Sequence, residues 1–280
     1  MKVGLALGGG FARGMAHVGV LQALEQHAIP IDLVAGTSAG SLVGAMYCAG
    51  LDPWQMEQHV DKINWRSLVR LRLRRDGLLD AEGLERWILS MVGDLTFPEL
   101  RMPFTVTATD LQAGTEVLLR EGRVAQAVRA SCAFPGIFLP VKLGEQTLVD
   151  GGLINPVPTR ICREMGADLV IGVELGRSAG EQVAPRNLIH IVLGALSLVQ
   201  RPLVASTLAE GDVVIQPELG SFSIWELERA REMIAEGRRA AEEAIPEILA
   251  LMARHGRGET LGEPLSGQDS VLIAPKEPPQ

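Results

Sequence analysis

Aromatic residues and cysteines are scarce in this chain of 280 residues. Phe, Trp and Tyr make up 4% of the sequence, although hydrophobic residues together reach 47%. A core of this composition must be mainly aliphatic. The three cysteines, Cys48, Cys132 and Cys162, are odd in number and lack metal-binding spacing, so the sequence indicates neither a disulfide framework nor a zinc site. We expect buried thiols in a reducing cytoplasm.

An excess of basic residues is also missing. The chain has 26 Lys and Arg against 34 Asp and Glu, a formal net charge of −8, which argues against nucleic acid as a partner. One segment differs, because residues 62–75 contain several Lys and Arg, a tryptophan and leucines, but no Asp or Glu. Such a segment fits peripheral contact with an anionic membrane, or a cap over a functional site. The alternative is a solvated arginine face on a surface helix.

A membrane-spanning segment is not expected. Residues 33–51 carry no formal charge and approach the length of a span. They also contain four glycines and three Ser or Thr residues, so a buried strand that runs into a buried helix explains them better. Lys2 is followed at once by an apolar strand pattern, and we therefore expect no secretory signal. The predicted location is cytoplasmic, with peripheral association at the inner face of the membrane if residues 62–75 bind lipid.

The most informative motif is Gly-x-Ser-x-Gly at residues 36–40. An apolar run, 31–35, precedes it, and a helical stretch of small residues, 41–49, follows it. This order predicts a strand, a sharp turn and a helix, with Ser38 in strained geometry at the apex. The helix dipole and free amides would then face the place where an oxyanion forms. The pattern favours a nucleophilic serine; the alternative is a glycine-rich packing turn.

A glycine run, Gly8-Gly9-Gly10, follows the first predicted strand. A dinucleotide-binding turn would need an acidic residue at the end of the second strand, about 20 residues on. The 36–40 turn occupies that position, and Asp32 lies at the start of the strand instead. We therefore reject nucleotide binding and expect no cofactor. The amides of Gly9 and Gly10 suit an oxyanion hole that the amide of Ala39 completes.

A third turn, Asp150-Gly151-Gly152, follows a short apolar strand and places a carboxylate beside closely approaching backbone. Alone it could be an ordinary loop. The three glycine-marked turns in this order resemble the patatin-like phospholipase family of serine–aspartate dyad hydrolases. The resemblance covers roughly residues 3–175, and it includes the segment 129–136, Arg-Ala-Ser-Cys-Ala-Phe-Pro-Gly.

The resemblance implies roles for individual residues. Ser38 would be the nucleophile and Asp150 the base, and the substrate would be an acyl ester or a phospholipid, with no metal. Phe11 stands where many relatives have glycine or alanine. The residues implied for the oxyanion and substrate are Gly8, Gly9, Gly10, Arg13 and Ala39. The motif glycines are Gly14, Gly36, Gly40, Gly151 and Gly152.

A dyad needs no histidine, whereas a triad in the order Ser, acid, His would have to use His190 or His255. His190 lies in an apolar stretch that predicts a packed helix, and His255 opens a polar, glycine-rich tail. We expect a structural or solvated role for both. In a dyad, Asp150 would accept the serine proton directly and later activate water.

Strands and helices alternate along the chain, which predicts a three-layer α/β/α sandwich with a mainly parallel central sheet, as in patatin-like proteins. A turn at 111–115 predicts that part of the sheet is antiparallel. Strands are expected at 3–7, 31–35, 104–110, 116–119, 147–149, 169–174 and 213–216. Helices are expected at 15–26, 41–49, 82–91, 124–130 and 156–165, and beyond 187.

Three regions are expected. Residues 1–220 would form a patatin-like catalytic domain, residues 221–255 C-terminal helices that pack on it, and residues 256–280 a disordered tail. Pro246 is expected to start a further short helix. The amphipathic C-terminal helices could pair between subunits of a homo-oligomer.

Two hypotheses for function follow. The first is a serine hydrolase that cleaves carboxylic esters of lipids, in the manner of a lipid acyl hydrolase or phospholipase A, through a dyad and an acyl-enzyme. The second is a regulatory acyl-binding protein whose dyad is vestigial or very slow.

Overall fold

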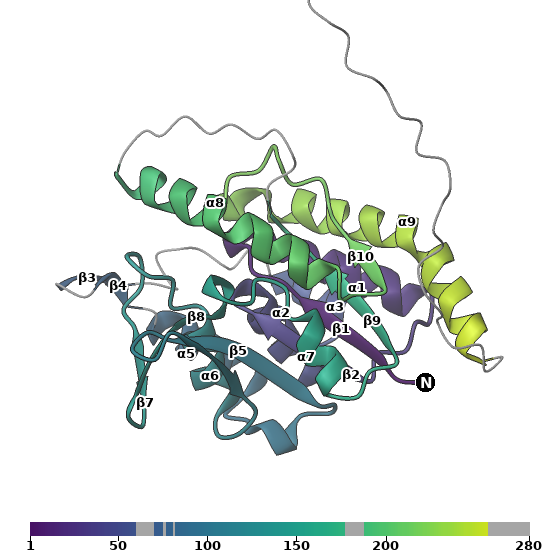
Figure 1. Cartoon of the computed structure of the whole chain (residues 1–280), viewed down its shortest axis with the longest axis horizontal. Helices are drawn as coiled ribbons and strands as arrows, with labels where there is room; N and C mark the ends of the chain where they lie inside the picture. The colour runs from purple at the N-terminus through teal and green to yellow at the C-terminus, as the bar shows by residue number, and fades with distance from the viewer. Residues whose placement is uncertain (60–69, 75–76, 81, 177–187, 257–280) are drawn as a thin grey trace, which may run out of the picture.

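The computed structural model describes residues 1–59, 70–74, 77–80, 82–176 and 188–256, and helices flank its central sheet (Figure 1). The eight-stranded sheet has the order β10-β9-β1-β2-β5-β8-β7, with β6 paired to β5. Its strands are β1 (Val3–Leu7), β2 (Leu33–Thr37), β5 (Phe104–Asp110), β6 (Thr115–Leu119), β7 (Val141–Leu143), β8 (Gln146–Asp150), β9 (Leu169–Val173) and β10 (Val213–Ile215). The strands from β10 to β5 in this order are parallel, whereas β6, β7 and β8 join antiparallel.

Helices cover both faces of this sheet, as the alternation of strands and helices predicts. The α-helices of the described residues are α1 (Ala16–Gln26), α2 (Ala39–Cys48), α3 (Pro53–His59), α5 (Glu82–Val92), α6 (Val124–Ser131), α7 (Thr159–Glu164), α8 (Leu188–Leu208) and α9 (Ala230–Gly256). Short 3-10 helices are η1 (Phe11–Met15), η3 (Phe97–Glu99), η4 (Gly151–Leu153) and η5 (Leu227–Arg229).

Side chains of β1 alternate between the two faces of the sheet. Leu5 and Leu7 belong to the large core cluster that includes apolar residues of α1, α2, α6 and α9. Ala6 belongs to a smaller cluster with Ile161 of α7, against which Leu208 of α8 packs. This two-residue period in a strand that is buried throughout confirms the three-layer arrangement.

Two expectations for local structure were wrong. Residues 70–74 form strand β3, paired antiparallel with β4 (Gly77–Asp80), and not part of a surface helix. The Arg-Leu-Arg-Leu-Arg pattern has the two-residue period of a strand. Residues 62–69 lie outside the described part of the chain, as do 257–280 of the predicted tail. Pro246 lies inside α9 and does not start a new helix, because Ala241, Ile245 and Ile248 continue one buried face across it.

The segment 33–51 forms β2 and α2, as expected for a buried strand followed by a buried helix. Within the described ranges, no helix combines the length and apolar character needed to cross a bilayer.

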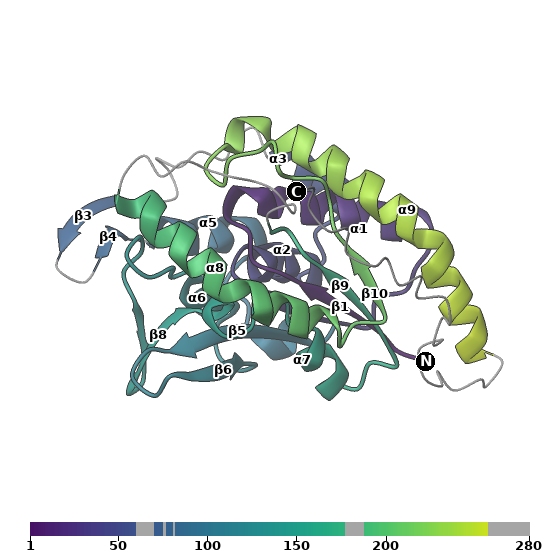
Figure 2. The same cartoon turned by 45° about the horizontal axis from the view of Figure 1, so that its top comes forward.

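Helix α9 lies along α1 (Figure 2), and two glycines permit this close approach. A Cβ on Gly19 of α1 would overlap the carbonyl oxygen of Ile234, and a Cβ on Gly237 of α9 would overlap that of Ala16. Each helix therefore uses a glycine to receive the backbone of the other. The C-terminal helix is joined to the layer beside the sheet by direct backbone packing.

Substitution of either glycine should force the two helices apart. We expect Gly19→Ala and Gly237→Ala each to destabilise the fold by about 1–3 kcal/mol, the usual range for overpacking. Gly194→Ala in α8 is the matched control, because nothing lies within 4 Å of its added Cβ. The control should be neutral, or more stable by up to about 1 kcal/mol through helix propensity. Denaturant unfolding measures all three, and equal effects at the three positions would contradict this packing.

Candidate active site

Ser38 lies at the junction of β2 and α2, at the carboxyl end of the parallel strands. Its backbone has φ 51° and ψ −121°, a left-handed conformation that is strained for a residue with a side chain. A Cβ on Gly40 would overlap the carbonyl oxygen of Leu7, and a Cβ on Gly36 would lie 2.6 Å from Cα of Ser41. The two motif glycines thus allow strand and helix to pass closely, which holds Ser38 at the apex of the turn.

Strand β5 brings the serine and the aspartate together. One of its edges pairs with β6, and the opposite edge is shared by β2 and β8. Thr37 pairs with Thr107, and Asp150 pairs with the next residue of β5, Ala108. Ser38 follows Thr37 directly, so it lies beside Asp150 at β5 although 112 positions separate the two residues in the sequence.

The Ser38 hydroxyl donates a hydrogen bond to Asp150 Oδ2 at 2.6 Å. The other carboxylate oxygen, Oδ1, accepts the amide of Gly152 at 2.8 Å. Asp150 is buried, and desolvation raises the pKa of its carboxyl from 3.8 to about 6, although both hydrogen bonds act to lower it. A carboxylate with this pKa is a stronger base than an exposed aspartate and is still ionised at neutral pH.

Hydroxyl groups of neighbouring elements fix the backbone on both sides of this pair. Ser131, the last residue of α6, accepts the amide of Ser38 on its Oγ at 2.8 Å. The Thr37 hydroxyl lies 2.7 Å from that of Thr107 and donates to the carbonyl of Asn155 at 2.9 Å. Thr109 donates to the carbonyl of Asp150 at 3.0 Å. The geometry of the turn thus depends on buried side chains from several elements.

The glycine loop after β1 lies beside Ser38, but only part of it is free to bind an anion. The amide of Gly8 donates to the carbonyl of Val173 at 3.0 Å, and that of Gly9 donates to Pro156 at 3.1 Å. The amide of Gly10 has no acceptor within the described residues. Ala39 begins α2, where an amide has no intrahelical partner. The free donors nearest the motif are therefore Gly10 and Ala39, which differs from the expected use of Gly9.

Two more glycines of the motifs allow close contacts around the loop. A Cβ on Gly14 would lie 2.6 Å from Cβ of Ala39, and one on Gly9 would lie 3.4 Å from Cβ of Ser38. On the aspartate side, a Cβ on Gly151 would overlap Thr107 of β5. The loop, the serine turn and the aspartate turn are therefore packed against one another. Gly14 and Gly151 leave no room for a side chain, whereas a Cβ on Gly9 would make an ordinary van der Waals contact.

His17 forms a hydrogen bond with the backbone of the glycine loop. Its Nε2 lies 2.8 Å from the carbonyl oxygen of Gly8, and since a carbonyl only accepts, Nε2 carries the proton. Complete burial lowers the pKa of His17 from 6.5 to about 4, so the ring is neutral at physiological pH. Its second nitrogen, Nδ1, is buried without a partner in the described part of the chain. Its role here is to position the loop.

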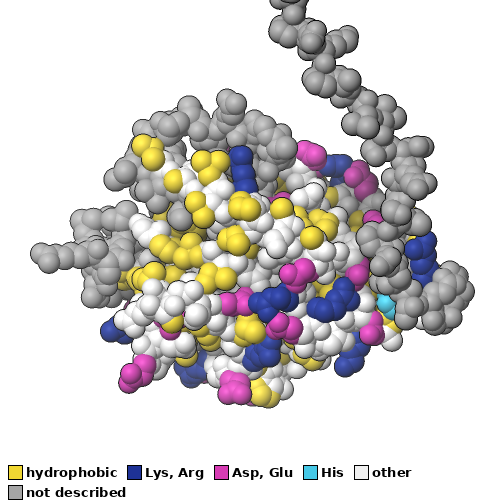
Figure 3. All heavy atoms as spheres, viewed as in Figure 1, with side chains coloured by type: hydrophobic (Ala, Val, Ile, Leu, Met, Phe, Trp, Pro, Cys, Tyr) yellow, Lys and Arg dark blue, Asp and Glu magenta, His cyan; other side chains and the backbone are white. Residues whose placement is uncertain are grey.

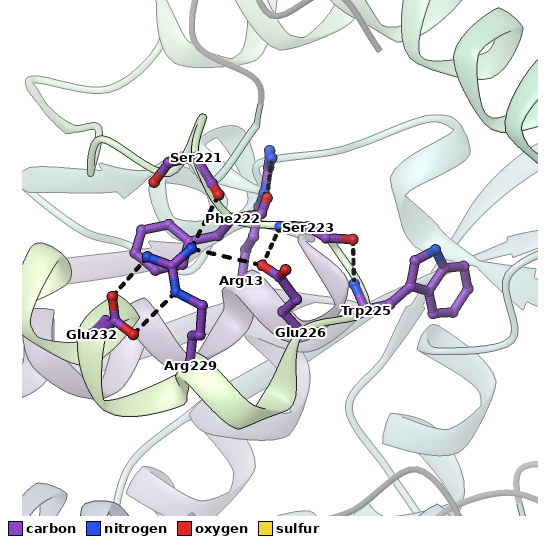
Figure 4. Close-up of polar contacts among 8 residues, drawn as sticks. All are labelled: Arg13, Ser221, Phe222, Ser223, Trp225, Glu226, Arg229 and Glu232. Carbon is purple, nitrogen blue, oxygen red and sulfur yellow. Dashed lines mark hydrogen bonds and ion pairs between the residues drawn. The ribbon is translucent and has the colours of Figure 1, made fainter. Parts of the chain in front are cut away.

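Arg13 points away from the loop toward the segment before α9 (Figure 4). Its Nε and Nη2 donate to the carbonyl of Phe222 at 3.0 and 2.6 Å, and its Nη1 donates to Gly176 at 3.4 Å. Arg229 lies 4.1 Å above the Phe222 ring and pairs with Glu232. Arg13 thus joins η1 to the segment that leads into α9, and the guanidinium contacts backbone carbonyls instead of facing the serine.

An aromatic cluster flanks the glycine loop. Phe11 has φ 51°, and its ring lies 5.1 Å from Phe134 and 5.4 Å from Trp225 between centroids. These tilted contacts are favourable for aromatic pairs and offset the strain of a bulky residue in left-handed geometry. Phe11 is therefore accommodated by rings from two distant segments.

The histidines that follow Asp150 in the sequence differ in what the structure describes. His255 lies in the last turn of α9, near Asp168. Asp168 accepts the amide of Lys2, at the amino ends of β1 and β9. His255 therefore lies near the amino ends of the parallel strands, whereas Ser38 lies at their carboxyl ends. His190 lies in α8, and its side chain is outside the described residues.

Sequence reasoning missed several residues around the site. Ser131 was noted only as part of a family-like segment, and Gln200 of α8, which donates to the carbonyl of Gly152 at 2.6 Å, was not noted at all. His17 carried a usable signal, since it is a polar residue between the apolar residues Ala16 and Val18. Gln200 carried none, because its contact depends on how α8 is placed over the aspartate turn.

A family model and several proteins match this chain. The model of the patatin-like phospholipases matches residues 5–163, more than half of the 280 residues. An uncharacterised NTE family protein of Mycobacterium tuberculosis is 38% identical over 184 residues, which is 64% of this chain and 51% of that protein. A protein named lysophospholipase nte1, of Aspergillus fumigatus, is 33% identical over 180 residues, covering 62% of this chain and 12% of that protein. The chain thus spans about half the length of the mycobacterial relative.

Two solved structures share the fold. VipD from Legionella pneumophila aligns with a TM-score of 0.54 and 15% identity, over 89% of this chain and 67% of VipD. ExoU from Pseudomonas aeruginosa, solved with SpcU, aligns with a TM-score of 0.51 and 16% identity, over 89% of this chain and 53% of that chain. At these identities the likeness concerns the fold alone.

The burial of Asp150 predicts an unusual stability profile. A folded-state pKa of about 6, above the ordinary 3.8, means that Asp150 contributes stability below pH 4 and that this contribution is lost as the pH rises through 6. The ionised carboxylate should therefore cost on the order of 3 kcal/mol at neutral pH. We expect Asp150→Asn to be more stable than the wild type at pH 8, and the gain to shrink toward zero near pH 4.

Denaturant titrations at several pH values measure this effect. Ser38→Ala is the control, because it keeps the buried carboxyl and removes one of the hydrogen bonds that favour its ionised form. It should gain no stability at pH 8. An Asp150→Asn protein that is less stable than the wild type at pH 8 would show that the carboxylate carries no burial penalty.

Proposed function

This chain belongs to the patatin-like phospholipase family, and from that premise we propose that it hydrolyses carboxylic esters of lipids. The single observation that carries the proposal is the hydrogen bond of 2.6 Å from Ser38 to the buried carboxylate of Asp150. A strained serine at a helix N-terminus, bonded to a base with a raised pKa, is the arrangement that nucleophilic catalysis requires.

In the proposed mechanism, Ser38 Oγ attacks the ester carbonyl while its proton moves to Asp150 Oδ2. The amides of Gly10 and Ala39 hold the oxyanion of the tetrahedral intermediate. When the intermediate collapses, the alcohol leaves with the proton from Asp150 and the acyl group stays on Ser38. Water then attacks the acyl-enzyme as Asp150 takes a proton from it. The second tetrahedral intermediate breaks its bond to Ser38 Oγ, Asp150 returns the proton to that oxygen, and the carboxylic acid is released. No metal or cofactor enters these steps.

The substrate class rests on the family and on the lysophospholipase name of one relative. We propose an acyl-lipid or lysophospholipid substrate for this chain. Contact of residues 62–75 with an anionic membrane, the cytoplasmic location, pairing of subunits and the regions 1–220, 221–255 and 256–280 stay predictions.

Ser38 should be the residue that reacts with an ester-like inhibitor. We expect a fluorophosphonate probe to label the wild type at Ser38, and Ser38→Ala to abolish both labelling and ester hydrolysis. Asp150→Asn should lower turnover by several orders of magnitude, because an amide cannot accept the serine proton. Labelling is followed by gel fluorescence, and turnover with p-nitrophenyl esters of graded chain length and then with defined phospholipids.

His255→Ala is the matched control and should keep turnover within a few-fold of the wild type. An intact protein that neither reacts with the probe nor hydrolyses any ester would support the alternative of an acyl-binding regulatory protein. Loss of more than about a hundredfold in His190→Ala, with the fold intact by circular dichroism, would instead indicate a triad.

The pH dependence should follow Asp150. The carboxylate acts as base only when ionised, so kcat/KM should fall below a pH of about 6, tenfold per unit at the acid end. The profile of His255→Ala should show the same limb. A flat profile between pH 7 and pH 4.5, with folding checked at each pH, would contradict the assignment of Asp150 as the base.

A further inference from the structure

Helix α8 presents apolar side chains to solvent. Ile191 is 53% exposed, Leu198 59% and Val199 67%, and these are among the most exposed large hydrophobic residues of the described chain. Ala195, Pro202 and Ala205 are exposed as well, at the three- and four-residue spacing of one helical face. Figure 3 shows hydrophobic side chains gathered over the part of this face of the molecule where α8 lies. We call these six residues the outer face of α8.

Other residues of α8 contact the rest of the protein. Leu208 contacts the small core cluster against α7, and Gln200 donates to the carbonyl of Gly152. A surface helix normally turns its polar side to water, whereas a helix that is apolar all round is normally covered. An exposed apolar face of this kind marks a site of interaction.

The outer face is joined to the catalytic turn by one side chain. Gly152 accepts from Gln200 and at the same time donates to Asp150 Oδ1 at 2.8 Å. Gln200 is the neighbour of Val199 along the helix. A surface that docks on the outer face therefore lies against the same helix that contacts the aspartate turn.

The charges on α8 distinguish between a second copy of the chain and a lipid bilayer as the partner that covers this face. Residues 188–208 contain no Asp or Glu, and Arg201 is exposed among the apolar residues, in a chain of net charge −8. Two copies of α8 packed on each other would offer no carboxylate from this helix to either Arg201. A bilayer that contains anionic phospholipid satisfies both features, since its interior accepts the apolar side chains and its head groups pair with the arginine.

We propose that the outer face of α8 docks the protein on the surface of an anionic phospholipid bilayer. This proposal rests on the proposed lipid hydrolysis and names the form in which substrate is met. Docking along α8 places the bilayer surface against the helix whose Gln200 contacts the aspartate turn.

Vesicle co-sedimentation tests the proposal directly. The probes are vesicles of phosphatidylcholine alone and of phosphatidylcholine with phosphatidylglycerol in equal parts, at low salt. The wild-type chain should bind the anionic vesicles, and Leu198→Glu with Val199→Glu should weaken binding at least tenfold. Arg201→Glu should weaken binding to anionic vesicles only, and its effect should fade at high salt.

The matched control places two glutamates at exposed leucines elsewhere. Leu111 is 53% exposed and Leu249 of α9 is 46% exposed. Leu111→Glu with Leu249→Glu changes the net charge equally and should bind vesicles within twofold of the wild type. Both double variants should cleave a short soluble ester at the wild-type rate, whereas only the α8 variant should lose activity on lipid in bilayers.

Several results would overturn the proposal. One is a wild type that does not bind anionic vesicles, and another is equal loss in both double variants. A third is a dimer in analytical ultracentrifugation that the α8 variant converts to a monomer while vesicle binding persists, since the face would then join two copies of the chain. Ser38→Ala should bind vesicles as the wild type does. If the protein binds vesicles through α8 but hydrolyses no ester, the proposed function is wrong and the docking surface on α8 still holds.

Discussion

The hydrogen bond from Ser38 to Asp150 depends on β5 more than on either residue's own turn. β5 pairs with β2 along one half of an edge and with the antiparallel strand β8 along the rest of that edge. The parallel strand β2 ends directly before Ser38 and the antiparallel strand β8 ends at Asp150. Because the two strands run in opposite directions along this edge of β5, their carboxyl ends meet there. The site is therefore built where the parallel and antiparallel parts of the sheet meet.

Burial makes the carboxylate of Asp150 a stronger base, and the same burial lowers the stability of the folded protein when that carboxylate is ionised. Desolvation raises the pKa of Asp150, while Ser38 and Gly152 limit that rise through their hydrogen bonds. His17 shows the same physics with the opposite sign, since burial lowers its pKa and keeps a neutral donor under the glycine loop. Two buried titratable groups are thus held in the states that the site needs, one as a base and one as a neutral support.

Close packing of backbone is the second theme of the structure. Glycines let β1, α2 and the loop approach one another around Ser38, and another pair lets α1 and α9 touch. Arg13 links these two regions, because it extends from η1 to the carbonyl of Phe222 ahead of α9. The C-terminal helix therefore supports the layer that carries the glycine loop, although it contributes no residue to the catalytic pair.

Local patterns in the amino-acid sequence are enough to predict the alternation of strands and helices, the strained turn at Ser38 and the three turns that contain the glycine loop, the serine and Asp150. These features are local, since they follow from apolar periodicity and from the space that only glycine leaves. Long-range packing determines which amides remain free at Gly10 and Ala39, where Arg13 points, that residues 70–74 form a strand, and that Gln200 reaches the aspartate turn. Each of these depends on a partner far away along the chain, and neither residue type nor spacing encodes which distant backbone group a donor will meet.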